Sequence, residues 1–252
     1  MRFFSKSKAH SNDREDNLRI LDDNTPFAIN EAFRALYTKV LYLPISDKCK
    51  KIAITSAFSG EGKTYVSINL AISLAKNSDS KKVLLIDMDM RKPRVARLFT
   101  KYYNEAAERG GLSEYLASIH DTPNLIPTDI PNLSILFSGK ESANPIGLIN
   151  SARMNELIAT CSEQFDYIII DTPPVGVVSD AVLLADKING YIMASRADYS
   201  NVNELSSAID ALTDVGAEVY GVVLSSVNLK SLGTYGKSYQ KSGYHYYSHD
   251  KD

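Results

Sequence analysis

Short apolar segments alternate with longer amphipathic segments along most of the chain. Apolar runs of strand length, bounded by turn residues, predict buried strands at residues 51–56, 83–86, 133–137, 166–170, 191–194 and 220–224. Between them, apolar residues at helical spacing predict helices at residues 64–76, 145–161 and 202–215. Buried strands that alternate with helices are typical of a mostly parallel sheet with helices on both faces. The pattern therefore predicts an α/β fold.

The two ends of the chain depart from this alternation. Residues 1–26 are polar and charged with little periodicity, which predicts a flexible arm. Residues 27–44 read as an amphipathic helix, in which Leu36 and Val40 share the apolar face. One domain is then expected at residues 45–228. The apolar pattern fades after it, so residues 229–252 predict a mobile tail.

Composition and charge limit the classes of function. The chain has 252 residues, 44% hydrophobic and 23% charged, which suits one globular domain. A net charge of -2 removes the electrostatic case for nucleic acid as the main partner. No apolar run approaches the roughly 18 residues of a transmembrane helix, and the N-terminus lacks the apolar core of a signal peptide. We therefore expect a cytoplasmic protein in which Cys49 and Cys161 are packed, reduced thiols.

A glycine-rich loop follows the first predicted strand. Residues 57–64 read Ala-Phe-Ser-Gly-Glu-Gly-Lys-Thr and directly precede a predicted helix. Such a loop points backbone N–H groups and the positive helix N-terminus at phosphate groups. Lys63 would reach the terminal phosphates without contributing to the core, and Thr64 would bind Mg²⁺. The predicted nucleotide-binding residues are Ser59, Gly60, Glu61, Gly62, Lys63, Thr64, Tyr65 and, from the next motif, Arg91.

Acidic residues end two of the following strands. Asp87 and Asp89 are two residues apart, so an extended backbone turns both carboxylates to one face, and the fork of Arg91 suits phosphate. Asp171 follows the apolar segment Tyr-Ile-Ile-Ile. Because ligands of α/β sheets bind at the C-terminal ends of strands, Asp89 and Asp171 are expected to hold Mg²⁺ and its waters. The alternative is that these acids only end strands and cap helices.

Tyrosines are concentrated at the end of the chain. Tyr235, Tyr239, Tyr244, Tyr246 and Tyr247 lie among Gly, Ser, Lys, Gln and His residues. Their spacing fits neither a helix nor a strand, although a last strand packed on the core is an alternative. A nucleotide-binding loop together with a flexible set of phenols suggests that ATP is used to phosphorylate tyrosine.

These motifs resemble those of the bacterial protein-tyrosine kinases. The loop at 57–64, Ile-Asp-Met-Asp-Met-Arg at 86–91 and Ile-Ile-Asp-Thr-Pro-Pro at 169–174 are similar to the family's Walker A, A′ and B motifs. The segment Gly-Gly-Leu-Ser-Glu-Tyr-Leu at 110–116, Asn144-Pro145 and the tyrosine-rich end are similar too. The resemblance spans residues 27–247 and is to the cytoplasmic capsular-polysaccharide type (CpsD/CapB-like). It implies a P-loop NTPase fold, with ATP and Mg²⁺ as cofactors.

The residues also predict a mechanism, and the resemblance implies partners. We expect subunits to phosphorylate one another's tail tyrosines, with Asp87 as the base, Lys63 stabilising charge, and Thr64, Asp89 and Asp171 at the metal. The expected partners are further copies in a ring, a membrane polysaccharide co-polymerase that recruits and activates the kinase at the inner face of the cell membrane, and a tyrosine phosphatase. The process served would be capsular or exopolysaccharide synthesis and export.

Two positions depart from the family pattern, and two other classes of function stay open. Tyr37 stands where the family's assembly helix has a second Arg after Glu31 and Arg34, and Ser225 stands where relatives usually have Asn near the base. A partition or division-site ATPase is one alternative, but such proteins have Lys at the position of Phe58 and lack a tyrosine tail. An ATP-binding scaffold without kinase activity is the other.

Overall fold

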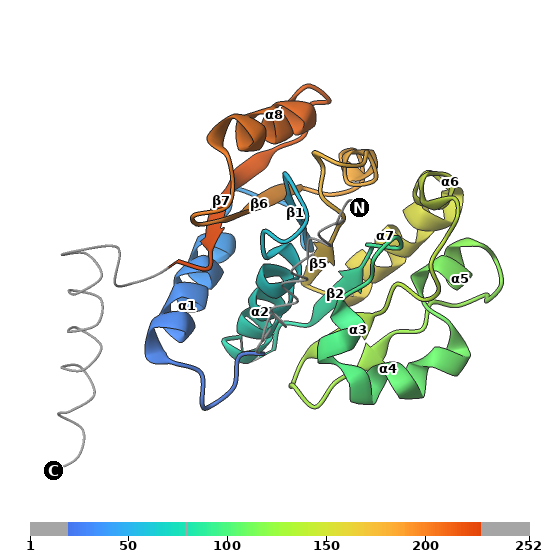
Figure 1. Cartoon of the computed structure of the whole chain (residues 1–252). Helices are drawn as coiled ribbons and strands as arrows, with labels where there is room; N and C mark the ends of the chain where they lie inside the picture. Colours follow the sequence, from blue (N-terminus) through green and yellow to red (C-terminus); the bar gives the residue numbers. More distant parts are fainter. Residues whose placement is uncertain (1–19, 79, 228–252) are drawn as a thin grey trace, which may run out of the picture.

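One sheet forms the centre of the protein in the computed structural model, which describes residues 20–78 and 80–227 (Figure 1). Its strands follow the order β3-β4-β2-β5-β1-β6-β7. Every neighbouring pair is parallel except β3 with β4. The strands are β1 (Lys50–Ser56), β2 (Val83–Asp87), β3 (Ile126–Pro127), β4 (Leu133–Leu136), β5 (Tyr167–Asp171), β6 (Gly190–Arg196) and β7 (Val219–Ser225). The predicted α/β fold with a mostly parallel sheet is confirmed.

Helices cover both faces of this sheet (Figure 1). Alternate residues of the strands point to opposite faces and so build two apolar layers. One layer includes α1 (Phe27–Leu41), α2 (Lys63–Lys76) and α3 (Val95–Leu98), with α4 (Thr100–Ala106) and η1 (Ala107–Arg109) following along the chain. The other includes α5 (Leu112–Leu116), α6 (Pro145–Ile149), α7 (Ala152–Gln164), η2 (Val182–Leu184) and α8 (Val202–Thr213).

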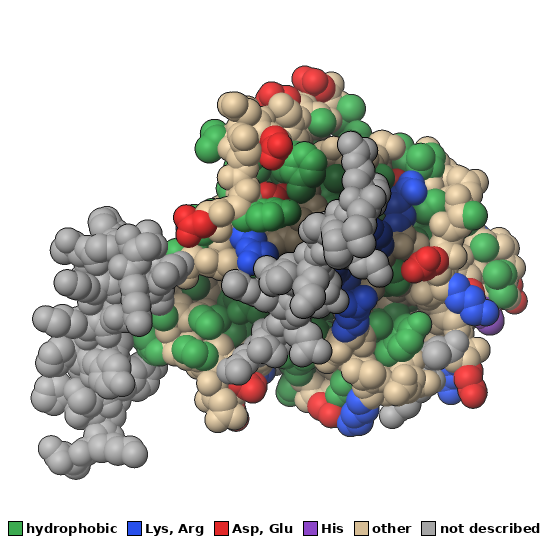
Figure 2. All heavy atoms as spheres, in the orientation of Figure 1, with side chains coloured by type: hydrophobic (Ala, Val, Ile, Leu, Met, Phe, Trp, Pro, Cys, Tyr) green, Lys and Arg blue, Asp and Glu red, His purple; other side chains and the backbone are tan. Residues whose placement is uncertain are grey.

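Helix α8 shows how one face of a helix is selected for burial. Ala208 and Leu212, four residues apart, are buried against the sheet side of the helix. Figure 2 shows acidic side chains where Figure 1 places α8, and Glu204 and Asp210 of this helix are exposed. The spacing of apolar residues that predicted this helix therefore marks its inner face.

The helix predicted at residues 145–161 is wrong in one respect, because the structure has two helices there. Helix α6 ends at Ile149, and Ser151 adopts an extended backbone with ψ of 155°. The Ser151 hydroxyl accepts a hydrogen bond from the backbone N–H of Met154 and caps α7. The short elements β3, α3, α4, η1 and α5 were not predicted, since none is long enough to show a clear period.

Both cysteines lie in the same apolar layer, as free thiols that are no more than 2% exposed. Burial raises the pKa of Cys161 from 9.0 to about 11. In the unfolded chain this thiol ionises near its ordinary pKa, so unfolding releases a proton between about pH 9 and pH 11. The contribution to stability is therefore complete below about pH 9 and falls as the pH rises, by up to about 1.4 kcal/mol per unit.

We expect urea unfolding to show this loss between about pH 9 and about pH 11 and to show a shallower loss in Cys161→Ser, which cannot ionise there. Neither thiol should react with a maleimide in the folded protein. Equal pH slopes for the two proteins would contradict the assignment to Cys161.

Candidate active site

The loop between β1 and α2 has the shape of a phosphate cradle. Gly60 and Gly62 have φ angles of 88° and 89°, in the left-handed region that favours glycine. A Cβ on Gly62 would also lie 2.7 Å from the hydroxyl oxygen of Ser225, so the position lacks room for a side chain. Helix α2 begins directly after this glycine, at Lys63, one residue before the predicted start. Backbone N–H groups and a helix N-terminus therefore converge here, as phosphate binding requires.

The sheet brings the predicted acids of two strands together. Strand β2 pairs with β5, and Asp87 lies opposite Asp171 in the register. The ammonium nitrogen of Lys63 lies 3.0 Å from Oδ2 of Asp89 and 4.0 Å from Oδ1 of Asp171. All four side chains are buried. A lysine of the phosphate loop thus lies among three carboxylates, so Lys63 is an interior ion-pair partner and the expectation that it contributes nothing to the core is wrong.

The carboxylates differ in their hydrogen bonds. Asp87 accepts from the backbone N–H of Asp89 and of Val95, each at 3.2 Å. Oδ1 of Asp171 accepts from the Ser67 hydroxyl at 3.1 Å, whereas its buried Oδ2 has no hydrogen-bond partner among the described residues. A buried carboxylate oxygen without a partner is costly in an apo protein and suits a hard cation such as Mg²⁺. The residues present therefore fit a magnesium ion beside Asp171.

Burial sets the protonation of this cluster. It raises the pKa of Asp87 well above the usual range, with the charge of Asp171 adding to the effect and the Lys63 ammonium opposing it. Burial also raises the pKa of Asp171, against the charge of Lys63 and a hydrogen bond from Thr64. The pKa of Lys63 is raised, because the charges of Asp171 and Asp89 outweigh burial. A carboxylate with a raised pKa is better matched to take up a proton at neutral pH.

Other predicted nucleotide-binding residues point elsewhere. The ring of Tyr65 packs edge-on against Phe33 of α1, with centroids 5.6 Å apart. The carboxylate of Glu61 accepts hydrogen bonds from the backbone N–H of Phe58 and the hydroxyl of Ser200. These two residues can therefore offer only their backbone groups to a nucleotide in this conformation. Sequence reasoning missed Ser67 and Ser200; Ser67 could have been found, since it lies one helical turn after Lys63.

The guanidinium of Arg91 is occupied by a partner that the sequence did not suggest. It donates two hydrogen bonds, at 2.8 and 2.9 Å, to the carboxylate of Asp180. Asp180 is fully buried and follows β5 by nine residues, and its partner follows β2. The ion pair therefore ties the segment after β2 to the segment after β5.

We expect Arg91→Ala to lower the free energy of unfolding by about 1–3 kcal/mol, because Asp180 is left buried and unpaired. Arg91→Lys keeps the charge but loses the two-pronged geometry, so it should recover only part of this loss. The double variant Arg91→Ala/Asp180→Asn is the matched control and should be more stable than Arg91→Ala alone. Chemical denaturation measures all three, and an unchanged midpoint in Arg91→Ala would contradict a structural role.

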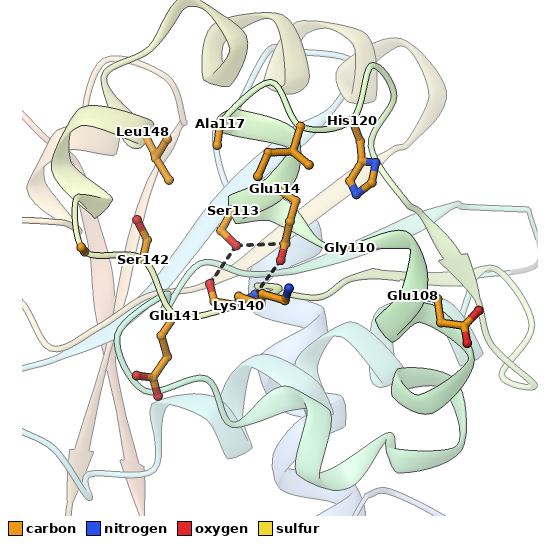
Figure 3. A pocket seen from close by; sticks show the side chains of 12 residues that line it. Glu108, Gly110, Ser113, Glu114, Ala117, His120, Lys140, Glu141, Ser142 and Leu148 are labelled. Atoms are coloured by element: carbon orange, nitrogen blue, oxygen red, sulfur yellow. Dashed lines mark hydrogen bonds between the residues drawn. The ribbon is translucent and has the colours of Figure 1, made fainter.

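A cavity of about 370 Å³ is lined by residues of the family-like segment 110–116 and of the segment 140–143 (Figure 3). Glu114 lines it and accepts hydrogen bonds from the backbone N–H groups of Gly111 and Lys140, at 2.8 and 3.1 Å. A Cβ on Gly111 would lie 2.4 Å from the backbone nitrogen of Gly139. The motif therefore fastens two backbone segments that cross closely, which is a structural role.

A phosphate cradle with a buried lysine and acids from neighbouring strands defines a P-loop nucleotide-binding protein, and residues 49–217 match the model of the AAA domain family. The chain is 37% identical over 208 residues to the tyrosine-protein kinase CpsD of Streptococcus agalactiae serotype III, covering 82% of this chain and 85% of the relative. The chain belongs to the bacterial protein-tyrosine kinases of the CpsD type.

Solved structures agree with this assignment. The chimerical protein CapA2B2 superposes with a TM-score of 0.70 at 32% identity, covering 80% of this chain and 85% of that chain. The kinase domain of the Escherichia coli tyrosine kinase ETK superposes with a TM-score of 0.70 at 28% identity, covering 85% and 87%. This chain is therefore a nucleotide-binding protein-tyrosine kinase. No helix among the described residues is long and apolar enough to cross a membrane.

Proposed function

We propose that this kinase transfers the γ-phosphoryl group of ATP to the tail tyrosines of a neighbouring copy. The observation that carries the proposal is the contact of Lys63 with carboxylates from two paired strands, at the end of a phosphate cradle. The proposed acceptors are Tyr235, Tyr239, Tyr244, Tyr246 and Tyr247, which lie outside the described residues. A nucleotide site and a cluster of phenols in one chain support an autokinase.

The residues of the site divide the work of transfer. The phenol oxygen attacks the γ-phosphorus, the bond to the bridging oxygen of ADP breaks, and Asp87 accepts the phenol proton. Asp87 has room for this proton, since a carboxylate offers about four lone-pair positions and, within residues 20–78 and 80–227, the backbone groups of Asp89 and Val95 donate to it. The ammonium group of Lys63 leaves its ion pair with Asp89 and binds the terminal phosphates of ATP. Mg²⁺, held by Thr64, Asp89 and Asp171, would supply further neutralisation of phosphate charge when bound.

Assembly and partners form the second part of the proposal. In the single chain Glu31 and Arg34 of α1 pair with each other at 2.9 Å, and 57% of the Arg34 side chain is exposed. Exposed pairs of this kind contribute only about 0.3–0.5 kcal/mol, so both groups can be redirected to another copy at low cost. We infer a homo-oligomer, a ring in the resembled family, with a membrane polysaccharide co-polymerase as activator at the inner face of the membrane.

Charge on the tail would end the reaction. Between Tyr235 and Tyr247 the fixed charges are Lys237 and Lys241, and each phosphate adds about -1.5 to -2. Phosphorylated tails that converge in a ring would repel one another and release the subunits. A tyrosine phosphatase would restore the assembly, which gives a cycle that regulates capsular or exopolysaccharide synthesis and export.

A mixing experiment tests transfer between copies. One variant carries Lys63→Met with an intact tail, and the other carries an intact site with all five tail tyrosines replaced by Phe. Neither alone should give phosphotyrosine in the tail, whereas the mixture with ATP and Mg²⁺ should label Tyr235 to Tyr247 by mass spectrometry. An unlabelled mixture alongside a labelled wild type would contradict transfer between copies. Light scattering before and after ATP then tests release, and an unchanged mass would contradict it.

A further inference from the structure

Glu61 belongs to the phosphate loop, and its carboxylate is bound by groups of the protein itself. Only 1% of Glu61 is exposed. Its Oε2 accepts a hydrogen bond from the backbone N–H of Phe58 at 2.7 Å, which closes the loop on itself. Its Oε1 accepts from the hydroxyl of Ser200, and its backbone carbonyl accepts from the hydroxyl of Ser225 at 2.8 Å. One residue thus holds three other parts of the chain.

Ser200 and Ser225 come from the β6 and β7 side of the sheet, next to β1. Ser200 lies in the turn after β6, where its hydroxyl oxygen also accepts from the backbone N–H of Arg196 at 2.7 Å. The same turn reaches the loop twice more, because Arg196 donates to the carbonyl of Gly60 and Tyr199 to that of Ser59, both at 3.4 Å. The turn at 196–200 and the end of β7 therefore form an outer support for the phosphate loop.

We propose that Glu61 is a positioning residue that fixes the phosphate loop in its ATP-binding shape before the nucleotide arrives. A loop that turns backbone N–H groups toward a ligand lacks the internal hydrogen bonds of a helix or strand, and glycines at 60 and 62 add conformational freedom. Bonds from the Glu61 side chain to Phe58 and Ser200 remove much of that freedom in advance. The conformational entropy of the loop is then lost during folding and not on binding, so ATP binds more tightly.

The proposal gives Ser225 a role as well. Its hydroxyl holds the Glu61 carbonyl and occupies the space beside Gly62 that a side chain would need. The residue that departs from the family pattern near the base is therefore an anchor of the loop.

A positioning role predicts a particular kinetic signature. Glu61→Ala should weaken ADP·Mg²⁺ binding and raise KM for ATP by about 10-fold while changing kcat less than about threefold, because preorganisation acts on ground state and transition state alike. Glu61→Gln can accept from Phe58 N–H through its oxygen and donate to Ser200 through its nitrogen. It should therefore stay within about threefold of the wild type in both constants.

The test measures ADP·Mg²⁺ binding by calorimetry and autophosphorylation kinetics on wild type, Glu61→Ala, Glu61→Gln, Ser200→Ala and Glu61→Ala/Ser200→Ala. Ser200→Ala alone should weaken ADP binding. The double variant should bind ADP little more weakly than Glu61→Ala, since both single changes remove the same hydrogen bond between Ser200 and Glu61. A fall in kcat of more than about tenfold in both Glu61→Gln and Glu61→Ala would overturn the proposal, as the charge would then act in the chemistry. Wild-type ADP affinity in Glu61→Ala would overturn it too.

If Glu61→Ala does not fold, Ser200→Ala tests the proposal instead. Its affinity for ADP should be lower than that of the wild type, and an unchanged affinity would contradict the proposal. The unfolding midpoint of each variant shows whether a loss of affinity comes from a loss of fold. Wild-type protein that binds ADP but forms no phosphotyrosine would count against the proposed acceptor and leave the role of Glu61 intact.

Discussion

Lys63→Met is expected to abolish phosphotyrosine formation and also to destabilise the nucleotide-free protein. Loss of a charge-stabilising donor in an active site typically reduces kcat by about 10²–10³-fold. The structural effect arises because Lys63 is only 7% exposed and its ammonium lies 3.0 Å from Asp89 and 4.0 Å from Asp171. Without it the carboxylates repel one another in a buried site and take up protons instead. We expect a loss of about 1–3 kcal/mol in the free energy of unfolding.

The double variant Lys63→Met/Asp89→Asn separates the two effects. It removes one of the repelling charges, so it should recover part of the stability while remaining inactive. Phosphotyrosine detection with contaminating kinases excluded and urea denaturation provide the two readings. Full autophosphorylation in Lys63→Met would contradict its role in transfer, and an unchanged unfolding midpoint would contradict its role as an interior ion pair.

Asp87→Asn is expected to keep nucleotide binding but lose transfer. The amide cannot take the phenol proton, and loss of a positioned base costs about 10²–10⁴-fold in rate. ADP affinity should change little, because the side chain of Asp87 lies on backbone N–H groups of its own segment, at Asp89 and Val95. Single-turnover phosphorylation at saturating ATP, with ADP binding by calorimetry, measures both quantities.

Asp171→Asn is the matched comparison, since it lies opposite Asp87 in the same pair of strands. The change replaces one carboxylate oxygen of Asp171 by an amide NH₂ and removes its negative charge. Because the Oδ2 of this carboxylate lacks a partner among the described residues and suits Mg²⁺, the variant should need a higher concentration of Mg²⁺ for activity. Asp87→Asn should leave that Mg²⁺ requirement unchanged. The same shift in both variants would show that Asp87 also serves the metal, and full activity in Asp87→Asn would exclude it as the base.

The parts of the site that are local in sequence could be predicted, whereas those that depend on strand order could not. The loop at 57–64 lies between a buried strand and a helix, so its position and chemistry follow from local pattern. The contact of Asp87 with the Asp171 strand arises because β5 inserts between β1 and β2, and strand order leaves no signature in one sequence. The contact between Arg91 and Asp180, which are 89 positions apart, could not be predicted for the same reason.

Other errors have local causes. Ser151 had the residue type of a helix cap, but the apolar spacing continued across it, so two helices were read as one. Lys63 was read as a loop residue, although it is the first residue of α2 and its side chain turns inward. The tail and its tyrosines lie outside the described residues, so their predicted role stays a prediction.

The two edge strands of the sheet differ in whether they can pair with a further strand. Strand β3 has only the residues Ile126 and Pro127, and a proline has no N–H to donate to a further strand. Strand β7 runs from Val219 to Ser225, and in the described part of the chain it pairs with β6 alone. Any strand added to this sheet, from its own chain or another, would therefore lie along β7. Ser225 is the last residue of β7, and its hydroxyl donates a hydrogen bond to the carbonyl of Glu61 in the phosphate loop. A strand added along β7 would therefore lie next to a residue that contacts the nucleotide-binding loop.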